Sequence, residues 1–204
     1  MRRTISSLAA QQRVKVAPYT TPMAVPRSVQ DMIRVDYAGE MAAVRICEAQ
    51  LWWVSPLSAT RLVVDEILEE ERYHRSTMEE LCRKYAVTPT AADSIFSMAT
   101  FGMGLGTAIL GEEAIMCCHA AVEDTITDHY NSQLRDIEEL RSDNSGSIGV
   151  IDELSNIVAS FRDDEQHHKE MGEVNGAAKA PFYHALYPSI QTACSIGILI
   201  ASKI

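Results

Sequence analysis

Six side chains of types that bind metal ions occur along the chain in a repeated order. A lone glutamate followed by a Glu-x-x-His motif occurs once within residues 40–74 and again within residues 123–168. On a helix, residues three positions apart share a face, so the carboxylate of such a motif can bridge two ions while its imidazole binds one of them. The predicted ligands of a two-metal site are Glu40, Glu71, His74, Glu123, Glu165 and His168.

The segments that carry these residues have the pattern of long helices. Apolar residues recur at spacings of three and four over residues 29–54, over 57–86, somewhere within 94–140, and over 148–173. Each apolar stripe is interrupted by a glutamate, and two of them also by a histidine. The strict alternation typical of strands is missing. We therefore expect an all-α domain whose helices turn ionisable side chains towards a common core.

Burial of these groups requires a compensating positive charge. Transfer of one isolated carboxylate into an apolar core costs several kcal/mol even after relaxation. The cost for all six groups exceeds the roughly 5–15 kcal/mol of net stability that a domain possesses, so we expect bound cations to offset it. Carboxylate-rich ligation with two imidazoles favours iron or manganese over zinc, and iron is preferred here. The predicted architecture is a ferritin-like four-helix bundle that holds two Fe ions.

Two further segments lack Asp, Glu, Lys and Arg. They are residues 94–111, which are rich in glycine, and residues 180–202, which Pro188 is expected to break. Neither has the pattern of a clean transmembrane helix, and we expect additional membrane-interfacial helices that dip into one leaflet and admit an apolar substrate. Buried core helices or contacts within a homo-oligomer are the alternative. The glycines at 102, 104 and 106 form no dinucleotide motif, because no strand precedes them.

Charge and composition restrict the partners and the compartment. The formal net charge of -10 provides no basic face for phosphates, which excludes nucleic acid as a partner. Five scattered cysteines favour a reducing compartment and are expected to be small buried apolar residues. Residues 1–25 are basic, rich in Ser, Thr and Ala, and free of acidic residues, as mitochondrial targeting segments are. We expect the folded di-iron domain to span residues 26–204; a disordered basic arm is the alternative for residues 1–25.

The chain resembles the demethoxyubiquinone hydroxylases of ubiquinone biosynthesis, the Coq7/CLK-1 family, in the segments VDYAGEMAAVRI, EEERYHRSTMEEL, AVEDTITDHYNSQLRDIEEL and FRDDEQHHKEMG. The resemblance runs from about Val29 to the C-terminus and implies the same six metal ligands. It implies a monooxygenase, peripheral on the matrix side of the mitochondrial inner membrane, that hydroxylates 5-demethoxyubiquinol or its quinone with O2. It also implies NADH as an electron donor and a lipid-binding partner, Coq9.

The resemblance further implies that His129 and Tyr130 lie near the metal site and transfer electrons from a reductant, or protons. Ordinary residues of a helix surface are the alternative for this pair. Two other functions stay open. One is a different reaction on the same scaffold, namely ferroxidase iron storage, manganese catalase or quinol oxidase. The other is a non-catalytic quinone-binding scaffold subunit that keeps the metal site for stability.

Overall fold

The described part of the chain is helical, as predicted. The computed structural model describes residues 13–90, 93–143 and 147–203, and these residues contain no strand. A short 3-10 turn, η1 (Ala177–Lys179), precedes the last helix. The α-helices of the described residues are α1 (Arg27–Trp53), α2 (Ala59–Lys84), α3 (Asp93–Leu110), α4 (Glu112–Ser142), α5 (Ile148–Val174) and α6 (Tyr183–Ala201).

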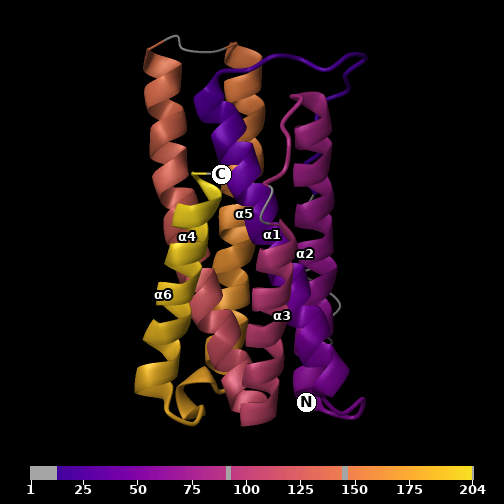
Figure 1. Cartoon of the computed structure of the whole chain (residues 1–204), viewed down its shortest axis with the longest axis vertical. Helices are drawn as coiled ribbons and strands as arrows, with labels where there is room; N and C mark the ends of the chain where they lie inside the picture. The colour runs from indigo at the N-terminus through magenta and orange to yellow at the C-terminus, as the bar shows by residue number, and fades with distance from the viewer. Residues whose placement is uncertain (1–12, 91–92, 144–146, 204) are drawn as a thin grey trace, which may run out of the picture.

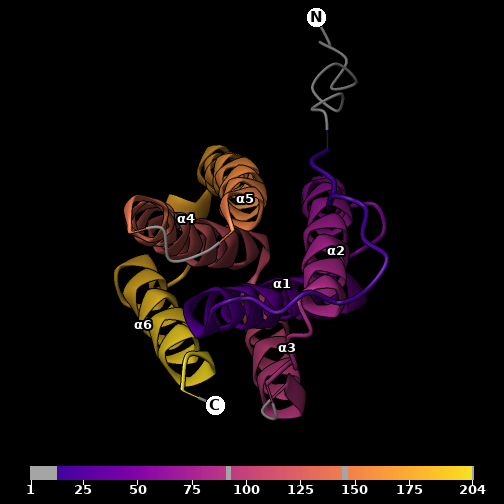
Figure 2. The ribbon, with the colours of Figure 1, turned by 90° about the horizontal axis from the view of Figure 1, so that it is seen from above.

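Four of these helices form a bundle, and the other two pack outside it. α1 packs extensively against α2, and α4 against α5, so the bundle consists of two antiparallel pairs (Figure 1). α3 lies against α1, and α6 lies against α4 (Figure 2). The predicted ferritin-like four-helix bundle with two additional helices is therefore confirmed. Its repeated unit is a helix pair, and each pair carries one lone glutamate and one Glu-x-x-His motif.

Local sequence signals set the helix ends. The Ser58 hydroxyl caps α2 by accepting a hydrogen bond of 3.0 Å from the backbone N–H of Thr60. The region predicted to contain one helix within residues 94–140 contains α3 and α4, because Gly111 adopts a φ of 119° between them. Acidic Glu112 and Glu113 then occupy the first turn of α4, where they interact favourably with the helix dipole.

Two glycines allow helices to approach closely. A Cβ atom added at Gly104 of α3 would lie 2.4 Å from the backbone oxygen of Ile46 in α1. One added at Gly172 of α5 would lie 2.7 Å from the backbone oxygen of Met116 in α4. Backbone atoms cannot move aside as a flexible side chain can, so larger residues at these positions would push the helices apart.

The expectation that Pro188 breaks the C-terminal segment is wrong. Pro188 lies inside α6, which continues to Ala201. The proline is in the second turn of the helix and is exposed, so the backbone hydrogen bond that it cannot make is lost at the surface and not in the core. Beyond it, Ile190 packs against α4 and the helix persists.

The two uncharged segments do not form the core. In α3 only Gly104, Thr107 and Ala108 are buried, whereas Ile95 and Met98 are 67% and 74% exposed. The large exposed apolar residues of α6 are Phe182 at its N-cap, Ile196, Leu199 and Ile200. The alternative of two buried core helices is therefore wrong for the described residues. α3 is also long and apolar enough to cross a membrane, a property that some helices of soluble proteins share.

Residues 13–25 lie along the bundle, although the predicted folded domain begins at residue 26. Val16 is buried, and the backbone N–H of Ala17 donates to Glu153 Oε1 of α5 at 2.5 Å. Lys84 of α2 donates to the Ala17 carbonyl at 3.0 Å and forms an ion pair with Glu153 at 2.8 Å. This N-terminal strap therefore connects α2 to α5. Residues 1–12 of the predicted targeting segment lie outside the described residues.

We predict that Glu153→Gln lowers the free energy of unfolding by about 3 kcal/mol, because it leaves the Lys84 ammonium, 6% exposed, without its counter-charge. Urea denaturation monitored by circular dichroism measures the loss. Asp152→Asn is the matched control: its ion pair with Arg141 is exposed and contributes at most about 1 kcal/mol. Equal losses for the two variants would show that the buried pair does not hold the strap.

Candidate metal centre

The structure brings the six predicted metal ligands together in the middle of the bundle. α1 and α4 each contribute one glutamate, and α2 and α5 each contribute a glutamate and a histidine one turn later. All six side chains are nearly inaccessible to solvent, at 3% exposure or less. Buried carboxylates at this density are tolerated only where protons or cations neutralise them. The residues are Glu40, Glu71, His74, Glu123, Glu165 and His168.

These residues form two overlapping groups of four. In each group the ligand atoms lie within 4.8 Å of one another, as donors around one ion do. One group includes Glu40 and His74, and the other includes Glu123 and His168. Glu71 and Glu165 belong to both groups, so their carboxylates are placed to bridge two ions. Each half of the site therefore has one imidazole, one terminal carboxylate and two shared carboxylates.

The Nδ1 atoms of both histidines face the carboxylates. His168 Nδ1 lies 3.1 Å from Glu71 Oε1 and 3.1 Å from Glu165 Oε2. His74 Nδ1 lies 3.1 Å from Glu165 Oε1 and 3.6 Å from Glu40 Oε2. Both Glu71 oxygens and His74 Nδ1 are nevertheless buried without a hydrogen bond of acceptable geometry to any described residue. Atoms that crowd together without hydrogen-bonding directions fit ligands that converge on a common ion, so the residues present fit a metal pair.

Outer carboxylates orient the two histidines. His74 Nε2 contacts Asp164 Oδ2 at 3.2 Å, and His168 Nε2 contacts Glu70 Oε2 at 2.6 Å. A proton on Nε2 leaves Nδ1 as the metal-binding nitrogen, which is the usual arrangement of a ligating histidine. Glu70 and Asp164 each directly precede a predicted glutamate ligand in the sequence. The neighbouring Glu69, Asp163 and His167 are exposed.

The protein without bound ions holds protons at this site. Burial raises the pKa of Glu40 to about 8, and burial together with neighbouring carboxylates raises that of Glu123 well above its usual value. Burial opposes ionisation of Glu165 too, but the adjacent imidazoles of His168 and His74 lower its pKa. Burial likewise opposes the charge on each histidine, yet hydrogen bonds to carboxylates raise both pKa values. Metal ions must displace these protons.

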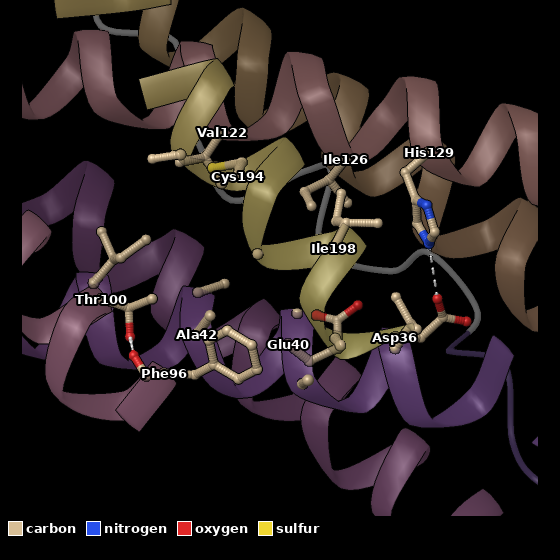
Figure 3. Close-up of a pocket in the computed structure, with 18 of the residues that line it drawn as sticks. Asp36, Glu40, Ala42, Phe96, Thr100, Val122, Ile126, His129, Cys194 and Ile198 are labelled. Carbon is tan, nitrogen blue, oxygen red and sulfur yellow. Dashed lines mark hydrogen bonds and ion pairs between the residues drawn. The ribbon is translucent and has the colours of Figure 1, made fainter. Parts of the chain in front are cut away.

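An apolar cavity of about 330 Å³ reaches the site from between α1, α3, α4 and α6 (Figure 3). The carboxylates of Glu40, Glu71, Glu123 and Glu165 line its inner end, and side chains such as Phe96, Met103 and Ile198 line its length. The cavity is therefore a passage from the exposed apolar helices to the metal ligands.

His129 and Tyr130 also line this cavity. Tyr130 is buried and its hydroxyl donates a short hydrogen bond to Glu40 Oε1. His129 is half-buried, and its Nε2 contacts Asp36 Oδ1 at 3.2 Å. The pair therefore lies beside the candidate ligands, and Tyr130 touches one of them. Ordinary surface residues of a helix would not be arranged in this way.

The sequence reasoning did not find Asp36 and His119, which are buried beside this site. Each precedes a predicted ligand by four residues on the same helix, and this spacing was the available signal. His119 Nδ1 lies 3.6 Å from Glu123 Oε1, and its Nε2 contacts Gln50 Oε1 at 2.8 Å. Burial lowers the pKa of His119 to about 3, so its imidazole is neutral. A polar residue one turn from a ligand on the same helix is therefore placed to orient it.

A helical bundle with two Glu-x-x-His motifs and two further glutamates facing inward defines the class of ferritin-like carboxylate-bridged metal proteins. The family model described as "Ubiquinone biosynthesis protein COQ7" matches residues 27–201. The chain belongs to the COQ7 family. The resemblance noted in the sequence is thus confirmed over all six helices.

Curated relatives from animals and bacteria match most of the chain. A Caenorhabditis elegans protein named "NADPH-dependent 3-demethoxyubiquinone 3-hydroxylase, mitochondrial" is 41% identical over 176 residues, 86% of this chain and 90% of its own length. A human protein of the same name is 33% identical over 177 residues, 87% of this chain and 78% of its own. A Rhodospirillum rubrum "3-demethoxyubiquinol 3-hydroxylase" is 32% identical over 176 residues, 86% of this chain and 78% of its own.

We predict that the apparent affinity for Fe(II) rises with pH through the raised pKa of Glu40, about 8. Below the raised pKa of Glu40, about 8, a proton competes with the ion for that carboxylate. Each proton displaced makes binding about tenfold tighter per pH unit. Anaerobic Fe(II) titrations between pH 6 and pH 9, roughly spanning that pKa, measure the slope. An affinity independent of pH would contradict proton displacement from the buried carboxylates.

Proposed function

We propose that the chain is a di-iron monooxygenase that adds a ring hydroxyl to demethoxyubiquinol or demethoxyubiquinone in ubiquinone biosynthesis, using O2 and an external reductant. The observation that carries this proposal is the apolar cavity that leads directly to a buried set of carboxylate and imidazole ligands. Membership of the COQ7 family and the names of its relatives support the same substrate class.

In this proposal Glu40, Glu71, His74, Glu123, Glu165 and His168 would hold two iron ions, and Glu71 and Glu165 would be available to both ions because they belong to both groups of ligands. When bound, the iron pair supplies the electrons that activate O2. The chain supplies the geometry. Glu70 and Asp164 fix the imidazoles, the Tyr130 hydroxyl fixes one oxygen of Glu40, and the apolar cavity walls exclude water from the reacting ring.

The electrons come from outside the chain in this proposal. The sequence resemblance implies NADH, whereas the names of the animal relatives specify NADPH, so a nicotinamide dinucleotide is the proposed donor class. The described residues contain no strand and hence no Rossmann unit to bind it. We assign His129 and Tyr130 to electron or proton transfer, because both line the cavity and the Tyr130 hydroxyl donates to Glu40.

The cavity also bears on the rival functions. Ferroxidase storage and manganese catalase act on small hydrophilic species and have no use for an apolar passage open to exposed apolar helices. A quinol oxidase or a non-catalytic quinone-binding scaffold would use such a passage. These two rivals are separated from the hydroxylase by the product formed.

We predict that the full chain purified under anaerobic conditions holds two iron ions per protein, with the Mössbauer spectrum of a coupled pair. With a short-tailed demethoxyquinol and a nicotinamide donor it should consume O2 and form a hydroxylated ring, detected by mass spectrometry. NADH and NADPH tested separately identify the donor. Glu71→Ala removes a shared carboxylate and His168→Ala removes an imidazole, so each should abolish product formation and lower the iron content.

Glu69→Ala is the matched control, because Glu69 is exposed on the same helix. It should keep both the iron and the activity. Oxygen consumption without a hydroxylated product would favour a quinol oxidase, and no consumption above background would favour a scaffold. A mononuclear or zinc-only centre would remove the proposal altogether.

We place the enzyme in mitochondria, since its animal relatives are named mitochondrial proteins and residues 1–25 have the composition of a targeting segment. We further propose that it is peripheral on the matrix side of the inner membrane. The exposed apolar side chains of α3 and α6 would enter one leaflet, on the side where the cavity opens between them. The same surface could instead contact a lipid-binding protein of the Coq9 kind or a second copy of the chain.

We predict that the full chain floats with phospholipid vesicles and that Met98→Glu weakens this binding, because it introduces a charge where α3 would enter the acyl region. Ile148→Glu is the control: Ile148 is 63% exposed at the start of α5, on the opposite side of the bundle from α3 (Figure 2). Equal binding of both variants would contradict a membrane-facing α3. A dimer that dissociates in Met98→Glu would assign the surface to a second copy.

A further inference from the structure

The metal end of the cavity carries a small polar cluster that the metal ligands do not account for. Asp36 of α1 and His129 of α4 line the cavity next to Glu40 and Tyr130, and their contact is drawn in Figure 3. The rest of the wall in this view is almost entirely apolar. A ring with polar substituents that enters the cavity would find its hydrogen-bond partners here.

Each carboxylate oxygen of Asp36 faces one hydrogen-bond donor. Its side chain has no solvent exposure. Its Oδ1 faces His129 Nε2 at 3.2 Å, and its Oδ2 accepts from Gln133 Nε2 at 2.8 Å. A buried carboxylate only accepts hydrogen bonds, so the His129 nitrogen that faces it must carry a proton. Asp36 thereby fixes the tautomer of His129.

The fixed tautomer determines what His129 offers to a ligand. A neutral imidazole has one N–H, and here it is on Nε2, so Nδ1 carries a lone pair and acts as an acceptor. No described residue donates a hydrogen bond to His129 Nδ1. The side chain is 23% exposed and lines the cavity. The Tyr130 hydroxyl is already used, because it donates to Glu40.

We propose that Asp36 is a positioning residue that makes His129 a hydrogen-bond acceptor, and that the cavity therefore prefers the reduced, quinol form of its substrate. A quinol hydroxyl can donate to His129 Nδ1. A quinone presents only carbonyl oxygens there, and two acceptors facing each other leave both lone pairs unpaired. The inference rests on the proposed function and specifies the redox form of its substrate.

The test uses two redox-inert probes with the iron-loaded full chain under argon. One is a methoxy-methylphenol with a short isoprenoid-like tail, and the other is its methyl ether, which lacks the donor. The phenol should bind the unmodified protein on the order of tenfold more tightly, the value of one hydrogen bond. Isothermal titration calorimetry measures both dissociation constants, and their ratio is the readout.

Asp36→Asn should abolish or reverse this preference. When its amide oxygen keeps the hydrogen bond from Gln133 Nε2, its NH₂ group turns to His129 and forces the proton onto Nδ1. Iron content and the Mössbauer spectrum should stay unchanged, whereas a merely structural defect would weaken both probes equally. Asp128→Asn is the matched control, since Asp128 is exposed and precedes His129 on α4. It should keep the preference for the phenol.

Three results overturn the inference. They are an unmodified protein that binds both probes equally, an unchanged ratio in Asp36→Asn, and a wild-type tautomer with the proton on Nδ1. Nitrogen NMR of the full chain loaded with diamagnetic Zn(II) reads that tautomer directly, so the inference can be tested even where Asp36→Asn does not fold. Hydroxylation without a phenol preference removes only this inference, whereas a protein that binds neither probe removes the proposed function as well.

Discussion

The burial of four carboxylates and two imidazoles inside an apolar bundle is the constraint on which this structure depends. Protons shared between the carboxylates and the imidazoles can neutralise these groups pair by pair. The Glu71 oxygens are then still without hydrogen bonds of acceptable geometry. Two divalent cations would neutralise four carboxylates and give each ligand atom a partner. The site therefore costs stability when it is empty of cations and contributes stability when it binds them.

This constraint also explains how the two halves of the bundle are joined. The α1–α2 and α4–α5 pairs are each well packed, whereas α2 and α5 have few direct contacts with each other. Across that boundary lie the shared carboxylates, the contacts of the two imidazoles with Asp164 and Glu70, and the N-terminal strap with its Lys84–Glu153 ion pair. These polar and ionic groups act together with a buried apolar cluster that contains residues of both helix pairs.

The sequence was sufficient for the parts of this architecture that follow from periodicity. A glutamate that interrupts an apolar stripe must face the same way as its neighbours, so the inward direction of Glu71 and Glu165 could be derived before any coordinates. Contacts between distant helices could not. Nothing local links Asp36 to His129 or Gln50 to His119, because the register between α1 and α4 sets those pairs.

The differences between prediction and structure can also be explained from particular residues. Pro188 predicts a break, but a proline near a helix start costs little, and packing on α4 preserves the helix beyond it. The composition of residues 1–25 predicts a targeting segment, but composition gives no information on docking. Burial of Val16 and the contacts of Ala17 with Lys84 of α2 and Glu153 of α5 depend on side chains that come together only on folding.

The two ends of the cavity impose opposite demands on neighbouring residues. Its outer part lies between α3 and α6, whose exposed apolar side chains would be a liability in water unless a lipid or protein surface covers them. Its inner end must hold charged ligands in a dry environment. The change from apolar wall to charged ligands takes place over about one turn of α1, between Asp36 and Glu40. α4 places a hydrogen-bond donor beside each of these carboxylates, Tyr130 beside Glu40 and His129 beside Asp36. A polar boundary this thin allows an apolar ligand to approach the metal ligands without admitting bulk water to them, because both oxygens of Asp36 and one oxygen of Glu40 already have protein donors.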